Sequence, residues 1–299
     1  MTALDPALVA SDVFGTLLDV RAGSYAAFER ILARANAAHV DVKAFWEAWE
    51  HANIRRYREP YRPYKAICAD SLAETLAAHG LDADGAERSI GEYFAAFADM
   101  PLYPDVARTF ARLGAKRRLA VVSNIDDDLF AVTRVAKEFD FAIVATAERA
   151  RGYKPDGALF RHLIAQAAKL GIDSTAILHM GQSQFTDLPG AKPLGLRVAW
   201  INRRGVALSP DVPAPDWILP DIAGVADLIG DSPESEFELD ARVRVGRRLD
   251  DGPALVQAPR IHATVGGQSF PDRAGPFFGQ RAQLVRSDRL GLHPRRAGE

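Results

Sequence analysis

The sequence has little of several features that would indicate particular classes of protein. Its 299 residues contain a single cysteine, Cys68, which excludes an intramolecular disulfide. The formal net charge of -2 gives no basic field for binding nucleic acid or an anionic membrane surface. No apolar run approaches the ~20 residues that span a bilayer, and the amino-terminal residues lack the basic and long apolar regions of a secretion signal. We therefore expect a cytoplasmic protein with a small-molecule partner, no nucleic acid and no membrane.

Short apolar runs recur along two parts of the chain, each followed by polar or turn-forming residues. They lie at residues 8–10, 119–122, 142–144, 176–180 and 197–201. Helical patterns separate them at residues 106–113, 128–138 and 158–170, with Gly114 and Gly171 at the ends of two of these. Strands that alternate with helices predict an α/β fold with a doubly wound parallel sheet.

The interval from residue 21 to 99 interrupts this alternation. It is a series of amphipathic helical segments, which we interpret as an inserted helical cap on a core formed by residues 1–20 and 100–230. Its aromatic residues are expected to pack together and not to bind a cofactor: Tyr25, Phe28, Phe45, Trp46, Trp49, Tyr61 and Tyr64. Residues 231–299 contain no lysine and no lasting periodicity, so we predict a disordered tail rich in Arg, Gly and Pro, with no assigned role.

An aspartate follows the first predicted strand directly, in the segment SDVFGTL at residues 11–17. In open α/β sheets ligands bind at the carboxyl ends of the strands, so this position places Asp12 beside a substrate. Gly15 allows the backbone to turn tightly there. An aspartate at a strand end is more often a turn or capping residue, so Asp12 acquires a chemical meaning only from the segments that accompany it.

Three further polar segments stand at comparable positions. The strand at 119–122 runs into Ser123 and Asn124, Lys154 lies just before a predicted helix, and Asp187 ends the segment GQSQFTD at residues 181–187. Each has an ordinary alternative, because Ser-Asn is a common turn and a lysine before a helix is commonly a solvated surface residue. Together, over residues 8 to 204, the four segments resemble in order the four motifs of the haloacid dehalogenase superfamily.

This resemblance implies a Rossmann-like core and a hydrolase that uses Asp12 as a covalent nucleophile. Lys154 would keep the nucleophile ionised, and Thr16 would bond to the nucleophile or its ester. Asp187 would position Lys154 and the hydrolytic water, and is a candidate general base. The last of the implied roles is binding of the substrate's anionic group, by Ser123 and Asn124.

Two departures from the superfamily's phosphatases bear on the reaction. Those enzymes carry a second aspartate two positions after the nucleophile to protonate a leaving alkoxide, but this chain has Phe14 there. A halide leaves without a proton, and dehalogenases of the family also have an aromatic at this position. The phosphatases hold magnesium partly through an acid where this chain has Gln182. We therefore predict dehalogenation of a short 2-haloalkanoic acid, with Phe14 and Gln182 at the substrate and no metal or other cofactor.

Other mismatches with the L-2-haloacid dehalogenases concern the substrate. Those enzymes offer Ser and Asn where this chain has Gln182 and Gln184, and a tyrosine where it has Phe160. Their halide-binding arginine follows a tryptophan in the first cap helix, but Trp46 and Trp49 are each followed by a glutamate. Three other arginines are alternatives, and we leave them out of the catalytic set: Arg55, Arg56 and Arg58.

Two other functions remain open. A magnesium-dependent phosphatase acting on a small phosphorylated metabolite would lose its activity in a chelator, which metal-free dehalogenation would survive. A non-catalytic binding protein would have no need of Asp12, Lys154 and Asp187 together. The aromatic surface of the predicted cap also allows a homodimer.

Overall fold

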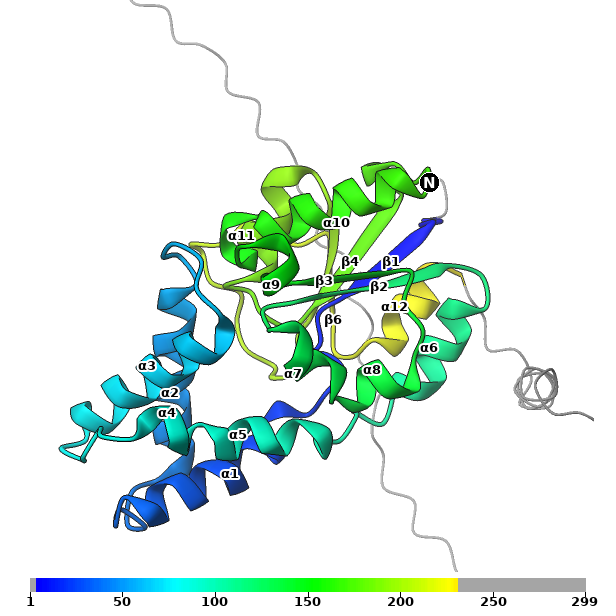
Figure 1. Cartoon of the computed structure of the whole chain (residues 1–299). Coiled ribbons are helices and arrows are strands. Elements are labelled where there is room, and N and C mark those ends of the chain that lie inside the picture. Colours follow the sequence, from blue (N-terminus) through cyan, green and yellow to red (C-terminus); the bar gives the residue numbers. More distant parts are fainter. Residues whose placement is uncertain (1–3, 231–299) are drawn as a thin grey trace, which may run out of the picture. The chain divides into compact units, whose positions relative to one another are not determined.

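The computed structural model describes residues 4–230 and contains a six-stranded parallel sheet within them (Figure 1). The strands are β1 (Leu8–Ser11), β2 (Arg118–Ser123), β3 (Ile143–Thr146), β4 (Ile177–Gly181), β5 (Arg197–Ile201) and β6 (Trp217–Leu219). The first five are buried almost throughout, because helices cover both faces of the sheet. Strands buried on both faces read as continuous apolar runs, and the predicted α/β fold is confirmed.

The order of the strands is β3-β2-β1-β4-β5-β6, so the direction in which the sheet grows reverses at β1. β1 pairs with β2 on one side and with β4 on the other, and Ser11 faces Val121 and Met180. The backbone N–H of Asp12 continues this pairing and donates to the carbonyl of Met180 over 2.9 Å. Such a reversal opens a crevice at the carboxyl ends of the strands, and Asp12 lies there.

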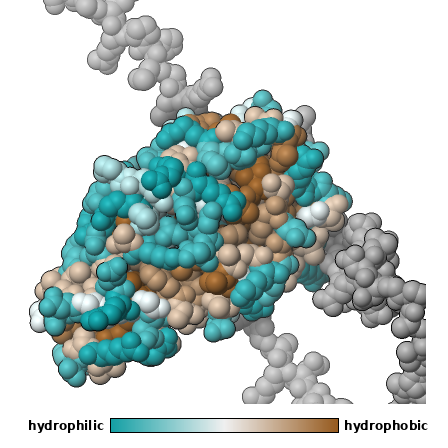
Figure 2. All heavy atoms as spheres, viewed as in Figure 1, coloured by the Kyte–Doolittle hydropathy of each residue, from teal (hydrophilic) through white to brown (hydrophobic). Residues whose placement is uncertain are grey.

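Helices cover the sheet on both sides (Figure 1). One side carries α9 (Ala147–Ala150), α10 (Ala158–Lys169) and α11 (Asp187–Ala191), and the other carries α6 (Val106–Gly114) and α12 (Ala223–Leu228). On the face shown in Figure 2 most residues are hydrophilic, and apolar residues gather between α10 and the helices α6 and α8 (Arg134–Glu138). Within residues 4–230, no helix has the length and apolar character needed to cross a membrane.

Two details of the core differ from the sequence-based expectation. The helix expected at residues 128–138 is two short helices, α7 (Asp127–Ala131) and α8, because Thr133 interrupts it. The hydroxyl of Thr133 donates to the carbonyl of Phe130 over 2.8 Å and accepts from the N–H of Ala136 over 3.2 Å, so it ends one helix and caps the next. Strand β6 and helix α12 were not expected, because a three-residue strand and a helix of six residues give almost no periodicity.

The interval between β1 and α6 is helical. It contains α1 (Val20–Arg34), α2 (Val42–Arg56), α3 (Tyr64–Ala78), α4 (Ala86–Ser89), α5 (Gly91–Ala95) and a 3-10 turn at Ala96–Ala98, here called the helical segment. Its aromatic residues form a buried core in which Phe28 contacts Trp49 and Tyr93, with ring centroids 4.9 and 5.6 Å apart. Of the aromatic residues expected to pack together, five are buried in this core and Tyr25 and Tyr61 are partly buried against it. The predicted tail at 231–299 lies outside the described residues.

The helical segment is bound to the carboxyl edge of the sheet through the start of α3. Pro63 stands at the N-cap position of α3 and makes no side-chain cap. Asp126, which follows β2, instead accepts hydrogen bonds from the N–H groups of Tyr64 over 2.8 Å and Lys65 over 3.0 Å. A core carboxylate thus caps a helix of the inserted segment, at the positive end of the helix dipole.

We expect the substitution Asp126→Ala to weaken this attachment. Loss of a helix cap costs about 1 kcal/mol, so the free energy of unfolding should fall by that amount, measured by denaturant titration. Amide hydrogen exchange at Tyr64 and Lys65 should accelerate in the same variant. The control is Asp128→Ala, which removes an exposed ion pair with Lys65 and an acidic residue from the first turn of α7, and should lower stability less than Asp126→Ala. Equal free energies of unfolding and equal exchange rates in the two variants would contradict the capping role of Asp126.

Candidate active site

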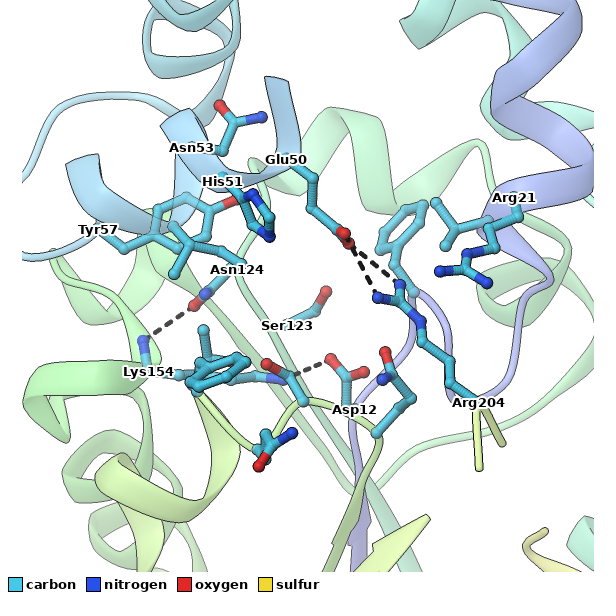
Figure 3. A pocket seen from close by; sticks show the side chains of 18 of the residues that line it. Asp12, Arg21, Glu50, His51, Asn53, Tyr57, Ser123, Asn124, Lys154 and Arg204 are labelled. Carbon is cyan, nitrogen blue, oxygen red and sulfur yellow. Dashed lines mark hydrogen bonds and ion pairs between the residues drawn. The ribbon is translucent and has the colours of Figure 1, made fainter. Parts of the chain in front are cut away.

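A cavity of about 300 Å³ lies between the carboxyl edge of the sheet and the helical segment (Figure 3). The sheet side contributes Asp12, Phe14, Ser123, Asn124, Lys154 and Gln182. The helical side contributes Arg21, Trp46, Trp49, Glu50, His51 and Tyr57, among others. The cavity thus combines the carboxylate predicted to react with a wall of aromatic and charged residues that the motifs did not indicate.

Asp12 lies at the floor of the cavity with 7% of its surface exposed. Its Oδ2 accepts a hydrogen bond from the hydroxyl of Thr16 over 2.7 Å, and its Oδ1 accepts one from Nζ of Lys154. Burial raises the pKa of Asp12, the Lys154 ammonium opposes this shift, and the nearby carboxylate of Asp187 adds to it. Burial thus favours the protonated form of Asp12, and the hydrogen bonds from Lys154 and Thr16 favour the ionised form. The ionised form is the one that can attack a substrate.

Lys154 connects the two carboxylates of the site. Its ammonium is 2% exposed and donates to Asp12 and, over 2.9 Å, to Oδ1 of Asp187. Burial alone would lower the pKa of Lys154, but the two carboxylates outweigh burial and raise it. The backbone of Lys154 is fixed as well, because its N–H donates to Oδ1 of Asn124 over 2.9 Å. Lys154 is consequently a charged, immobile ammonium group.

Asp187 is completely buried and is not among the residues that line the cavity. Its Oδ1 is hydrogen-bonded to Nζ of Lys154 and, over 2.9 Å, to Nε2 of His179. Its Oδ2 accepts a hydrogen bond from the N–H of Ser183 over 3.1 Å. Burial disfavours its charge, yet Lys154 and His179 lower the pKa of Asp187 to about 2. A carboxylate with these partners holds Lys154 in place.

Two glycines allow these groups to approach each other. A Cβ atom on Gly190 would lie 1.9 Å from the carbonyl oxygen of Lys154, where α11 packs against the turn that contains the lysine. A Cβ atom on Gly181 would lie 2.4 Å from Cγ of Asp187. Any larger residue at either position would displace part of the Asp187–Lys154 pair.

His179 is a site residue that the sequence did not reveal. It lies within β4, is completely buried, and contacts the ring of Phe160 edge-on at 4.8 Å between ring centroids. Its Nδ1 has no hydrogen-bond partner among the described residues, so Nε2 and Asp187 make its one polar contact there. A histidine within an apolar strand, two residues before Gly181, was the available signal, but the run at 176–180 was interpreted as a strand and no more.

We expect the substitution His179→Leu to reduce stability most strongly near neutral pH. The hydrogen bond to a charged carboxylate contributes about 1.5–3 kcal/mol, and its loss removes part of what lowers the pKa of Asp187. A lowered carboxylate pKa stabilises the fold above the unfolded-state pKa, and this contribution disappears as the pH falls. Denaturant titrations should therefore show a large difference from the parent at pH 7 and a smaller one at pH 3. His162→Leu, on α10, is the control.

The remaining predicted residues also lie at or beside the cavity. The N–H of Gln182 donates to the Thr16 hydroxyl over 2.9 Å, and its carbonyl accepts from Nε1 of Trp200 over 2.8 Å. Phe14 packs against Phe97 of the helical segment, with ring centroids 4.8 Å apart. An apolar ring thus occupies the position where superfamily phosphatases have an acid.

The arginines of the cavity come from places that the sequence did not indicate. Arg55 and Arg56 bind Glu74 away from the cavity, whereas Arg21 of α1 and Arg204, which follows β5, line it. The guanidinium of Arg204 contacts Glu50 of α2 at N–O distances of 3.2 and 3.4 Å (Figure 3). Because Arg204 and Glu50 are 154 residues apart, only the tertiary fold brings them together.

The donor set of the site does not fit a magnesium ion. Magnesium requires near-octahedral oxygen ligands, usually with one or two free carboxylates. Here the Lys154 ammonium lies between Asp12 and Asp187, and Gln182 replaces an acid.

Known proteins resemble this chain over most of its described length. Residues 6–195 match the family model described as haloacid dehalogenase-like hydrolase. The (S)-2-haloacid dehalogenase of Pseudomonas sp. (strain YL) is 28% identical over 225 residues, which cover 74% of this chain and 93% of that protein. Haloacetate dehalogenase H-2 of Moraxella sp. (strain B) is 26% identical over 226 residues, which cover 74% and 96%.

The fold is also shared with solved structures. The L-2-haloacid dehalogenase of Xanthobacter autotrophicus, with chloropropionic acid covalently bound, superimposes with a TM-score of 0.62 and 21% sequence identity. The match covers 75% of this chain and 98% of that one, so it includes the sheet and the helical segment.

Proposed function

The chain belongs to the haloacid dehalogenase-like hydrolases, and from this premise we propose that it hydrolyses the carbon–halogen bond of a 2-haloalkanoic acid through an ester on Asp12. The observation that carries the proposal is the Asp12 carboxylate, which is bound to an ammonium group, with Phe14 where a general acid would stand. This arrangement suits a leaving group that needs no proton. The names of the two dehalogenases that align over nearly their full length support the same reaction.

The reaction has two steps. In the first, a carboxylate oxygen of Asp12 attacks C2 of the substrate, a carbon–oxygen bond forms, and the halide departs with the electron pair of the carbon–halogen bond. In the second, water attacks Cγ of Asp12 and the ester opens. The 2-hydroxy acid leaves with the original aspartate oxygen, one proton of the water goes to the product hydroxyl, and the other is released to solvent. Asp12 keeps the oxygen of the water.

The described residues can perform each part of this chemistry. Lys154 keeps the Asp12 carboxylate ionised before attack, and Asp187 fixes Lys154. Ser123 and Asn124 line the cavity with a hydroxyl and an amide nitrogen, and the N–H of Lys154 binds the amide oxygen of Asn124. Both are donors suited to the substrate carboxylate.

The helical segment acts in this proposal as a cap that excludes water from the cavity during ester formation. Arg21 borders the cavity and supplies positive potential for the departing halide. A small anionic substrate fits this arrangement. A cytoplasmic location and a homodimer stay predictions of the sequence.

The test of the proposal is halide release from 2-chloropropionate, measured by ion chromatography. We expect release at an unchanged rate in the presence of a chelator, because Lys154 is paired with both Asp12 and Asp187 and Gln182 stands in place of an acid. A panel of phosphate esters should give no phosphate, with or without added magnesium. Phosphate release that a chelator abolishes would instead support the phosphatase.

A further inference from the structure

The cavity is larger than a two- or three-carbon haloacid requires. Its volume of about 300 Å³ falls at the lower end of the ~300–1,000 Å³ of pockets that hold drug-sized ligands. The carboxylate, C2 and halogen of the proposed substrate occupy the part next to Asp12 and Ser123. The rest of the cavity is space for a further part of the substrate.

The order of the strands shows where the remaining space of the cavity lies relative to Asp12. Ser123 ends β2 and Asn124 follows it, and Asp12 follows β1. Phe185 lies in the loop after β4 and Val206 in the loop after β5. The cavity extends from Asp12, at the end of β1, to the loops that follow β4 and β5. Neighbouring strands lie ~4.8 Å apart, so β5 is roughly 10 Å from β1.

Two exposed apolar residues line the cavity in this direction. Phe185 is 43% exposed and Val206 is 44% exposed, and we call this pair the apolar lip. The lip is held in place, because Asn202 binds both the N–H and the carbonyl of Val206, over 3.1 and 2.9 Å. Exposed apolar residues that border a cavity indicate a surface that a ligand covers.

Gln184 joins the two loops that carry the lip. Its amide nitrogen donates to the carbonyl of Ala207 over 3.2 Å, and its amide oxygen accepts from the N–H of Ser209 over 2.7 Å. The side chain is 8% exposed, so these are sheltered bonds that fix one loop against the other. The loops that carry Phe185 and Val206 are therefore hydrogen-bonded to each other and form one side of the cavity.

The charges of this region do not favour a second anionic group on the substrate. The Arg204 guanidinium, which is close to the lip in sequence, is paired with Glu50. This pair has no net charge, and the helical side of the cavity also presents the rings of Trp46, Trp49 and Tyr57. An apolar substituent suits this environment better than a carboxylate.

We propose that the preferred substrate is a 2-haloacid whose C2 substituent is an apolar chain longer than methyl, and that Phe185 and Val206 select this chain. The inference rests on the proposed function, since it assumes the carboxylate and C2 positions of that reaction. Phe185 and Val206 are specificity residues that contact the distal end of the chain and have no part in bond breaking.

The experiment measures kcat/KM for halide release from chloroacetate, 2-chloropropionate, 2-chlorohexanoate and 2-chlorosuccinate. For the parent protein, kcat/KM should be about ten-fold or more higher for 2-chlorohexanoate than for 2-chloropropionate. Phe185→Ala and Val206→Ser should each lower the value for 2-chlorohexanoate at least about five-fold and leave that for chloroacetate unchanged. The matched control is Leu170→Ala, which changes an equally exposed apolar residue outside the cavity and should alter neither value.

The outcomes separate this inference from the reaction on which it rests. Halide release that does not increase with chain length, or that the lip variants do not change, would overturn the substrate class and leave dehalogenation intact. Preference for 2-chlorosuccinate would also overturn it, because Arg204 would then bind a second carboxylate. Absence of halide release from all four acids would refute the proposed function and this inference with it.

Discussion

Replacing Asp12 with asparagine is expected to lower kcat for halide release by about 10⁴-fold or more, because the residue that forms the covalent bond is lost. The variant should still fold, since Lys154 keeps its hydrogen bond to Asp187 and burial already disfavours the charge of Asp12. The two measurements are single-turnover halide release and denaturant titration.

The control for this prediction is Asp128→Asn, an exposed carboxylate outside the cavity. It should leave kcat and the free energy of unfolding unchanged. If Asp12→Asn retained turnover within ten-fold of the parent, Asp12 would not be the nucleophile.

Replacing Lys154 with methionine is expected to have the second large effect, on both activity and stability. Two buried carboxylates would then face each other without the ammonium between them, and removing one partner of a buried ion pair costs about 3–5 kcal/mol. Activity should be lost as well, because Asp12 would hold a proton at neutral pH. Halide release and denaturant titration measure these two effects.

The pH dependence of this destabilisation distinguishes its cause from a packing defect. Without Lys154, the pKa of the carboxylates rises above the unfolded-state value of ~3.9. A raised pKa means that the folded state binds more protons, so its stability falls as the pH rises through this range. The variant should therefore be closest to the parent in stability at low pH and furthest from it at pH 7. A difference that does not change with pH would contradict the electrostatic explanation.

The sequence predicted the sheet well, because strands buried on both faces must be continuously apolar. The resemblance to the superfamily's motifs implied that Lys154 acts on Asp12, and the two side chains are in contact. The sequence-based prediction failed where a short element gives no periodicity, as in β6, and where one side chain interrupts a helical pattern, as Thr133 does between α7 and α8.

The rest of the site depended on contacts between distant parts of the chain. In the sequence, His179 is one residue of an apolar strand. Only the structure shows that its side chain is hydrogen-bonded to the active-site carboxylate of Asp187. Arg204 and Glu50 meet across the cavity, and neither belongs to a motif. On the sequence alone, the arginines considered were Arg55, Arg56 and Arg58, at or just after the end of α2. Which arginines face the cavity depends on how the helical segment packs against the sheet.

The most direct test of the account is a single turnover of excess enzyme with 2-chloropropionate in water enriched in oxygen-18. Mass spectrometry of the peptide that contains Asp12 should show one heavy oxygen in its carboxylate, and the 2-hydroxypropionate released should carry none. Heavy oxygen in the product alone would mean that water attacks the substrate directly, and it would contradict the ester on Asp12.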